Sequence, residues 1–297
     1  MDDLLLRAST GASRLEIAVL TSTQLVRAAS AAHGISGTSA IALGRLLTAT
    51  GLVGLASPRP GVTSIQILSQ SRVRQLFADV TEEGWLRGYV KNPSLSYPIL
   101  LNEDLFGRRT IGPAVVPGQV SVVRMGERGE YVQSATPLRD GEVDADVDHF
   151  LNQSDQVPSI LRCDVLVDRD GAVVAAGGVL ARALPDTRLE DIQTMAARIQ
   201  SGLVDEMLRE GASAEQLLAA LAPQGHETEA RMTPVWRCRC SKAKVLSTLR
   251  LLDVMELAQM VASDEAVEVR CDLCNTLHVA EPSELETIMK AKTQATS

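Results

Sequence analysis

Cys238-Arg239-Cys240 and Cys271-Asp272-Leu273-Cys274 stand near the end of this 297-residue chain, with residues 241–270 between them. The two pairs contain four of the five cysteines in the sequence. Closely spaced cysteine pairs of this kind form the ligand set of a structural metal site, and four thiolates favour Zn²⁺. The sequence therefore predicts a tetrathiolate site that holds one Zn²⁺ per chain in the reduced state.

The same four thiols also have a redox chemistry. They bind a metal ion only while they are reduced, because oxidation joins them as disulfides and removes the contribution of the metal to folding. One such site at the end of a large body with no other metal-binding motif is typical of a protein with a redox switch.

The expected local structure brings the four sulfurs together. Residues 235–240 are predicted to form a strand, in which residues i and i+2 point to the same side, so the first pair can face one ion. The second pair follows a predicted strand, 266–271, and has the spacing of a zinc knuckle. His278 is expected near the ligands or at the surface. The basic residues that could offset the negative charge of the site are Arg237, Arg239, Lys242, Lys244 and Arg270.

Residues 235–297 are predicted to form a small zinc-binding redox-switch domain, with helices from Ser241 to about Leu252, over 255–262 and from Ser283 onward. A unit of this size with few aromatic side chains has a thin core. Zinc contributes about 10–16 kcal/mol to the folding of small zinc peptides. We therefore expect metal removal to unfold this unit while the rest of the chain stays folded.

Residues 185–234 are predicted to form a helical, acidic linker. Nine acidic residues stand against four arginines here, a net charge of −5. Apolar residues recur every three or four positions, which indicates one amphipathic helix over 189–207 and a second, short helix from Ser213 to Ala222. The stripe of the first helix consists of Leu189, Ile192, Met195, Ile199, Leu203 and Met207. Two interpretations remain open: an ordinary helical hairpin packed on the main domain, or a metastable linker whose docking can be reversed.

Residues 1–184 are predicted to form one large α+β domain. Its expected strands cover 14–20, 63–71, 73–80, 85–90, 119–125, 131–136, 161–167 and 173–180, and turns rich in Gly, Pro and Asn separate many of them. Helices are expected from Thr21 or Ser22 to Ala32, over 36–55 and over 147–154. The helix over 36–55 is apolar enough to suggest a membrane span, but Arg45 at its middle favours a buried core helix. Cys163 shares a strand face with apolar residues and is therefore predicted to be buried and unreactive.

Composition excludes several classes of function. The net charge is −8 and the isoelectric point is about 5.1, which argues against non-specific binding of nucleic acid. Met1-Asp2-Asp3 does not resemble a secretion signal, so a cytoplasmic protein is expected, in a compartment where clustered cysteines favour metal or redox chemistry. The four histidines are scattered and suggest no catalytic triad, and we expect no enzymatic activity.

These residues, in this order, resemble the heat shock protein 33 family, the redox-regulated 33 kDa chaperonins of bacteria. The cysteine pattern matches, and so do His149-Phe-Leu-Asn-Gln-Ser-Asp-Gln-Val-Pro158, Ala175-Ala-Gly-Gly-Val-Leu180 and Pro282-Ser-Glu-Leu285. The resemblance covers essentially the whole chain. One departure is Thr276-Leu-His-Val279, where many members carry aromatic residues.

The resemblance implies a stress-response chaperone that holds unfolding proteins without ATP. Reduced, such a protein binds zinc and is inactive. On oxidation neighbouring cysteines pair, here Cys238 with Cys240 and Cys271 with Cys274, zinc leaves, and the linker unfolds to expose apolar surface. The implied partners are unfolded or oxidatively damaged proteins, together with a second copy of the chain on activation, and neither nucleic acid nor a membrane.

Three alternatives explain the cysteines differently. A zinc-ribbon module that binds nucleic acid more often has two Cys-x-x-Cys knuckles and a basic face. A thiol oxidoreductase using Cys271 and Cys274 needs a long helix that starts at the first cysteine, and Asn275–Pro282 does not predict one. A purely structural or regulatory zinc site would never be oxidised, and zinc release by peroxide would distinguish it from a switch.

Overall fold

The computed structural model describes residues 2–11, 13–57, 61–95, 97, 100–102 and 108–296. The chain forms two compact units, Met1–Arg237 and Cys238–Ser297, and each is described by itself. Both units combine helices with antiparallel strands, which confirms the expected α+β class.

One sheet of the first unit has five antiparallel strands in the order β10-β11-β2-β1-β12. The strands are β1 (Leu4–Ser9), β2 (Leu15–Thr21), β10 (Ser159–Val167), β11 (Val173–Ala183) and β12 (Glu227–Met232). Both faces of this sheet are apolar. On β1 and β2, for example, Leu5 and Leu20 enter one core cluster while Leu6 and Val19 enter another. The sheet must therefore be covered on both sides.

The second sheet of this unit has six strands in the order β13-β5-β4-β3-β8-β9. The strands are β3 (Val62–Ser69), β4 (Gln75–Thr81), β5 (Trp85–Val90), β8 (Gly118–Met125), β9 (Tyr131–Pro137) and β13 (Val235–Trp236). All neighbours are antiparallel except β13, which pairs in parallel with β5. Buried residues alternate along β3, as in a sheet with one face on the core.

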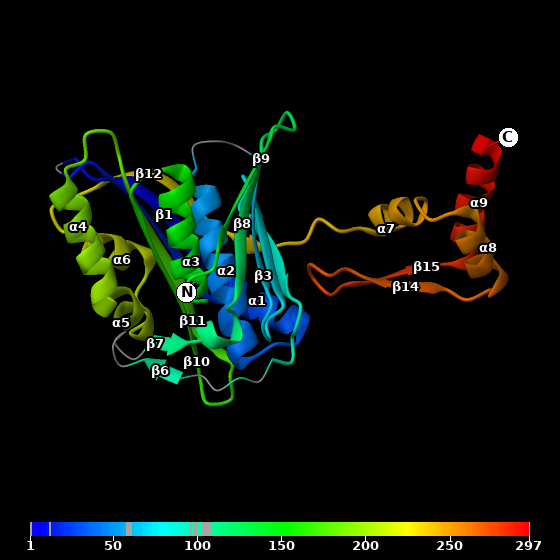
Figure 1. The fold of residues 1–297 in the computed structure, drawn as a ribbon, viewed down its shortest axis with the longest axis horizontal. Coiled ribbons are helices and arrows are strands. Elements are labelled where there is room, and N and C mark those ends of the chain that lie inside the picture. Colours follow the sequence, from blue (N-terminus) through cyan, green and yellow to red (C-terminus); the bar gives the residue numbers. More distant parts are fainter. Residues whose placement is uncertain are drawn as a thin grey trace. The chain divides into compact units, whose positions relative to one another are not determined.

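Helix α2 (Gly37–Leu55) lies in the core between the two sheets and contacts strands of both (Figure 1). It is long and apolar enough to cross a membrane, but 89% of its most apolar window is buried inside the structure. Arg45 at its middle is fully buried and pairs with Glu142 at 2.5 Å and Asp164 at 2.7 Å. The single charge of this helix is therefore neutralised within the core, as a buried helix requires.

Other helices complete the first unit. They are α1 (Thr23–His33), η2 (Gly112–Ala114), α3 (Val143–Phe150), η3 (Leu151–Asp155), α4 (Leu189–Arg198), η4 (Ile199–Leu203), α5 (Val204–Arg209) and α6 (Ala214–Leu221), and a small hairpin of β6 (Leu100–Asn102) and β7 (Arg108–Thr110) accompanies them. Figure 1 shows α4, α5 and α6 together on the face of the five-stranded sheet opposite α2. The linker segment thus supplies the second cover that this sheet needs.

The second unit has a two-stranded sheet and three helices among its described residues. They are α7 (Lys242–Leu249), α8 (Val254–Ala262), β14 (Val267–Arg270), β15 (Leu277–Ala280) and α9 (Pro282–Thr296). Asp253 and Glu256 form a capping box at the start of α8, and Ser241 caps α7. The buried apolar core is limited to Leu249, Leu257, Ala280, Leu285 and Ile288. This core is thin, as expected for so short a segment.

The linker helix differs from its prediction. The expected single helix over 189–207 is broken into α4, the π-helical turn η4 and α5, with Gly202 at φ 85° inside the turn. A π-turn contains one residue more than an α-turn, so it rotates the following residues around the helix axis. Periodicity alone could not predict this rotation, because only the backbone of Gly202 shows it.

Five strands escaped the sequence analysis: β1, β12, the short strands β6 and β7, and β15 of the second unit. Residues 4–9 form β1, and residues 227–232, within the segment expected to be helical linker, form β12 and pair with β1. Glu227, Glu229 and Arg231 give β12 the polar pattern of a loop, and its position at the edge of the sheet tolerates such a pattern. The proposed division into 1–184, 185–234 and 235–297 stays a prediction.

The prediction for Cys163 is confirmed as far as burial is concerned. The residue lies on β10 and is fully buried in the core beside Leu161 and Val165. Its sulfur occupies the space next to Gly178 on β11, where an added Cβ would come within 2.8 Å of Sγ. The thiol therefore acts as a small apolar filler.

Helix α3 and η3 seal the outer edge of β10. Side-chain oxygens of Asn152, Asp148 and Asp144, each four residues apart, accept the N–H groups of Ser159, Leu161 and Cys163 at 3.0, 2.7 and 3.0 Å. The spacing of four places all three side chains on one face of the helix, and the spacing of two places all three amides on one side of the strand. Side chains thus replace a neighbouring strand.

This seal predicts a pH dependence of stability. Burial, with the nearby charge of Asp144, raises the pKa of Asp148 to about 7. An unfolded aspartate has a pKa of about 3.9. At pH values between about 3.9 and about 7, folding takes up one proton, so the free energy of unfolding falls as the pH rises. Asp148→Asn, which keeps an accepting oxygen, should flatten the slope by up to about 1.4 kcal/mol per pH unit.

The measurement is urea unfolding from pH 5 to 8, followed by the fluorescence of Trp85 and Trp236, which both lie in the first unit. Asp170→Asn in an exposed turn is the matched control and should keep the wild-type slope. Equal slopes for Asp148→Asn and wild type would refute the burial argument.

Candidate metal centre

A tight turn between β14 and β15 presents Cys271 and Cys274. The N–H of Cys271 donates to the carbonyl of Thr276 at 3.0 Å, and the N–H groups of Cys274 and Asn275 donate to the carbonyl of Cys271 at 3.3 and 2.7 Å. Asn275 has a positive φ of 59°, a conformation that asparagine tolerates better than most residues. The backbone alone therefore holds both sulfurs on the inside of the turn.

Cys238 and Cys240 come from the segment between β13 and α7. The predicted strand over 235–240 is wrong in its second half, because regular strand ends at Trp236. Lys244 Nζ donates to the carbonyl of Arg239 at 2.7 Å and thereby ties this segment to α7. The two cysteines are thus placed by the start of a helix and not by strand pairing.

The structure brings the four sulfurs together. All four lie within 4.8 Å of one another, with 3.8 Å between Cys238 and Cys271 and 3.5 Å between Cys240 and Cys274. Zn–S bonds of about 2.3 Å in a tetrahedron require sulfurs about 3.8 Å apart. All five cysteines of the chain are in the thiol form. The four thiols could therefore hold a metal ion, and their number and spacing fit zinc.

The thiols differ in how readily they ionise. Burial raises the pKa of the Cys240 and Cys271 thiols, and the neighbouring cysteines raise both further. Burial opposes ionisation of Cys274 as well, but hydrogen bonds from the hydroxyl and backbone of Thr276 and from the other thiols outweigh it and lower its pKa to about 7. Cys274 is therefore the first of these three to become a thiolate, the form that binds metal or reacts with an oxidant.

Two of the basic residues that were expected to offset the negative charge of the site have other partners. Arg237 stacks on the ring of Trp85 at 4.1 Å, and Lys242 pairs with Glu284 at 2.8 Å. His278 Nε2 lies 3.3 Å from Sγ of Cys240. A histidine N–H beside a metal-bound sulfur stabilises the negative charge of that sulfur. His278, outside the four-sulfur set, is the neighbour best placed to do so.

The predicted linker stripe is divided by the structure. Ile192, Met195 and Ile199 are buried against the five-stranded sheet, and Leu203 and Met207 are half-buried at its margin. Leu189 is 70% exposed and does not dock. The side chains that continue the buried stripe beyond the π-turn are Val204 and Leu208. The sequence did not distinguish them from Leu203 and Met207, which are also spaced by four.

A buried ion pair also joins the linker to the sheet. Arg162 on β10 donates to Asp205 on α5 at 2.6 Å, and Asp205 is almost fully buried. Sequence analysis missed this pair because nothing in the local pattern of α5 distinguishes Asp205 from its exposed acidic neighbours. Its removal would leave a buried charge on the other partner, which costs several kcal/mol.

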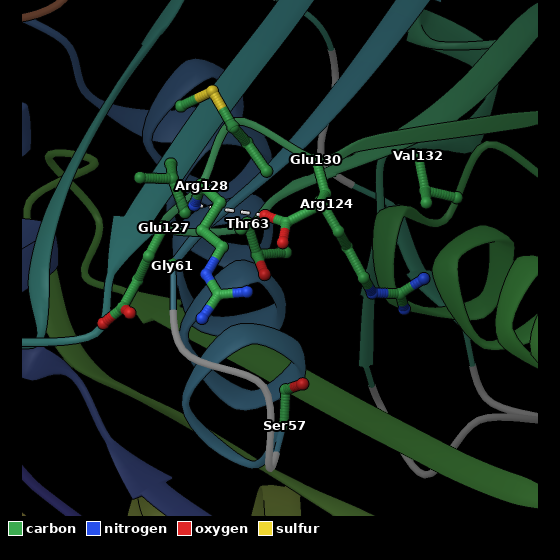
Figure 2. Close-up of a pocket in the computed structure, with 11 residues that line it drawn as sticks. Ser57, Gly61, Thr63, Arg124, Glu127, Arg128, Glu130 and Val132 are labelled. Carbon is green, nitrogen blue, oxygen red and sulfur yellow. Dashed lines mark hydrogen bonds between the residues drawn. The ribbon is translucent and has the colours of Figure 1, made fainter.

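A cavity of about 490 Å³ opens in the first unit beside the hairpin of β8 and β9 (Figure 2). Figure 2 shows charged side chains of both signs around it, among them Arg124, Glu127, Arg128 and Glu130. Arg124 is held by Asp155 at 2.7 Å, and the N–H of Arg128 donates to Glu130 at 3.1 Å. The charged side chains around the cavity are of both signs, so it offers no clear charge preference for a ligand.

Comparison with known proteins extends over nearly the whole chain. The family model described as Hsp33 protein matches residues 3–280. A 33 kDa chaperonin of Streptococcus gordonii is 31% identical over 280 residues, which cover 92% of this chain and 94% of the relative. A 33 kDa chaperonin of Thermus thermophilus is 32% identical over 299 residues, 96% of this chain and 86% of the relative.

A solved structure is also similar. The crystal structure of the 33 kDa chaperonin (heat shock protein 33 homologue) of Thermotoga maritima matches with a TM-score of 0.84 at 27% sequence identity. The match covers 99% of this chain and 100% of that structure.

The sulfur geometry predicts the outcome of cysteine replacement. Cys238→Ser with Cys240→Ser removes two of four thiolates and should reduce bound metal, measured by elemental analysis of protein purified under reducing conditions, from about one ion per chain to near zero. Cys163→Ala is the matched control, because its thiol lies in the core of the first unit, and it should keep the full metal content. Full metal content in the double variant would refute the four-sulfur site.

Proposed function

The chain belongs to the Hsp33 protein family, and we propose that it is a redox-regulated molecular chaperone that holds unfolding proteins without ATP. The observation that carries this proposal is the set of four reduced cysteines whose sulfurs all lie within 4.8 Å of one another. Such a set can exist in two chemical states, one that binds metal and one that contains disulfides. The protein has no enzymatic role in this proposal.

In the reduced state the four thiolates hold one Zn²⁺. The ion cross-links the second unit and catalyses no reaction. An oxidant such as a peroxide takes two electrons from each pair of thiols, and each pair forms one disulfide while the peroxide is reduced to water. We propose the pairs Cys238–Cys240 and Cys271–Cys274.

Loss of the metal then unfolds the second unit. Its described core has only five fully buried apolar residues, which supply little stability compared with the roughly 10–16 kcal/mol that zinc contributes in small zinc peptides. The first unit has two large core clusters and stays folded without the metal. The switch therefore acts on one part of the chain only.

The unfolding spreads to the linker through the chain itself. Between α6 and Cys238 lie β12, at the edge of one sheet, and β13, with two residues at the edge of the other. A polar edge strand such as β12 and a two-residue edge strand such as β13 each bury few apolar contacts, and we expect both to be held weakly. When α4, α5 and α6 leave the sheet, they uncover an apolar face, which includes Leu6, Leu15, Ile17, Val19 and Val179. We propose that this face and the released stripe bind unfolded or oxidatively damaged proteins.

The remaining parts of the proposal concern partners and location. We propose a protein of the cytoplasm, where cysteines stay reduced until oxidative stress, and a homodimer on activation. The acidic net charge of −8 speaks against the alternative of a zinc-ribbon protein that binds nucleic acid.

The alternative of a structural zinc site is tested by zinc release. Peroxide at raised temperature should free about one zinc per chain and at the same time start the suppression of client aggregation.

Weakened docking of the linker should activate the protein without oxidation. Ile199 is fully buried between α4 and the sheet, so Ile199→Asp places a charge in the apolar interface and should cost on the order of 3 kcal/mol of docking energy or more. The reduced, zinc-loaded variant should bind a hydrophobic dye and suppress aggregation of a heated client, both at several times the level of reduced wild type.

Leu189→Asp is the matched control, because it also replaces an apolar residue of the linker stripe by an aspartate, but on α4 at an exposed position, and it should behave like wild type. If reduced Ile199→Asp stays inactive although hydrogen exchange shows that its linker is open, the linker is not the gate and the clients bind elsewhere.

A further inference from the structure

The edges of the two large sheets differ in how they are protected. An unpaired strand edge exposes a row of N–H and C=O groups that can pair with another chain, and proteins usually block it with charges, bulges, very short strands or a covering element. The two sheets have four edge strands, β10 and β12 in one and β13 and β9 in the other.

Three of these edges are blocked. Four successive outward N–H groups of β10 are accepted by side-chain oxygens, because Asp164 accepts the N–H of Val165 at 2.8 Å in addition to the three hydrogen bonds to α3 and η3. β12 carries three charged residues in six and pairs with a register shift beside Ala8. β13 has only two residues.

The fourth edge, β9, has none of these protections among the residues that the structure describes, and a proline, which also blocks strand addition, stands only at its last position, Pro137. Its seven residues, Tyr131-Val-Gln-Ser-Ala-Thr-Pro137, include no charge, and they pair with β8 without a register shift. No described strand lies on its other side. Tyr131 is 61% and Val132 54% exposed, and the cavity shown in Figure 2 leaves open space beside Val132.

The hydrogen bonds at the two ends of β9 show which of its groups point outward. The N–H of Leu138 donates to Gly118, and the N–H of Gly126 donates to Glu130, both at 2.9 Å. Pairs that exchange hydrogen bonds alternate in an antiparallel ladder, so the even-numbered residues of β9 bond to β8. The odd-numbered ones direct their backbone groups away from the sheet: three N–H donors and four carbonyls, from Tyr131, Gln133, Ala135 and Pro137.

We propose that β9 binds an extended, uncharged segment of an unfolding client as an added strand. The row of outward backbone groups complements an extended chain, whatever its sequence, and the absence of charge on β9 sets no barrier to an apolar one. This is the kind of contact that a chaperone with many clients needs. The inference rests on the proposed function for the nature of the partner, and it adds a binding site separate from the face that the linker covers.

A second copy of the chain is a less suitable occupant. A ladder seven residues long buries little surface compared with the roughly 1,200 Å² or more of a stable interface. Such a contact suits weak, reversible binding that becomes firm only when a second contact on the same molecule joins it. The sheet face uncovered after oxidation is such a second contact. β9 is therefore exposed in the reduced state as well, but a client binds firmly only after oxidation, when both contacts are available.

Gln133→Pro tests the backbone contact. It removes an N–H that points outward and leaves the hydrogen bonds to β8 in place, and proline is tolerated on edge strands. Gln133→Ala is the matched control, because it removes the same side chain and keeps the N–H. With full-length protein oxidised by peroxide and reduced, carboxymethylated α-lactalbumin as a permanently unfolded probe, we expect Gln133→Pro to bind about tenfold more weakly than Gln133→Ala.

Amide hydrogen exchange of the oxidised wild type gives a second measurement that needs no variant. Addition of the probe should slow exchange at Gln133 and Ala135 and leave Val132 and Ser134, already bonded to β8, unchanged.

Equal binding by both variants together with unchanged exchange would overturn the inference while the proposed function stands. Protection that appears without probe and grows with protein concentration would assign the edge to a second copy and overturn it as well. Failure of oxidised wild type to bind the probe at all would refute the proposed function, and this inference with it.

Discussion

The five-stranded sheet is apolar on both faces, and the rest of the molecule follows from this constraint. One face is covered permanently by α2, whose only charge is neutralised by Glu142 and Asp164 inside the core. The other face is covered by α4, α5 and α6, which belong to an acidic segment and hold the sheet through buried apolar side chains and the ion pair of Arg162 with Asp205. In the proposed function this second cover is the one that leaves, so that the sheet exposes apolar surface without losing its fold.

In the proposed switch, the cysteine cluster provides the chemical control that this release needs. Its unit has a small buried apolar core, so we expect its folding to depend on what the four thiols bind. Because the thiols are held by a backbone turn and by the start of a helix, the site forms only when the unit folds. Metal binding, folding of the unit and continuity with the linker strands β12 and β13 are therefore coupled along a single stretch of chain.

Much of this architecture was predictable from the sequence, and the failures have specific causes. The four cysteines, the buried helix around Arg45 and the core position of Cys163 follow from spacing and periodicity, which are local properties. β12 was missed because an edge strand needs no apolar face. The side chains of Val204 and Leu208 were missed because the rotation at Gly202 appears only in the backbone, and the pairing of Arg162 with Asp205 because it joins residues far apart in sequence.

Gly202 makes the docking of the linker depend on one backbone angle as well as on apolar side chains. A residue other than glycine there would disfavour the φ of 85°. A regular helix without the extra residue of the turn would place Leu203 and Met207, in place of Val204 and Leu208, on the face that meets the sheet. Every side chain of the stripe would be chemically unchanged, yet the ion pair of Asp205 would be lost. The side chains that hold the linker on the sheet are thus selected at a position that has no side chain of its own.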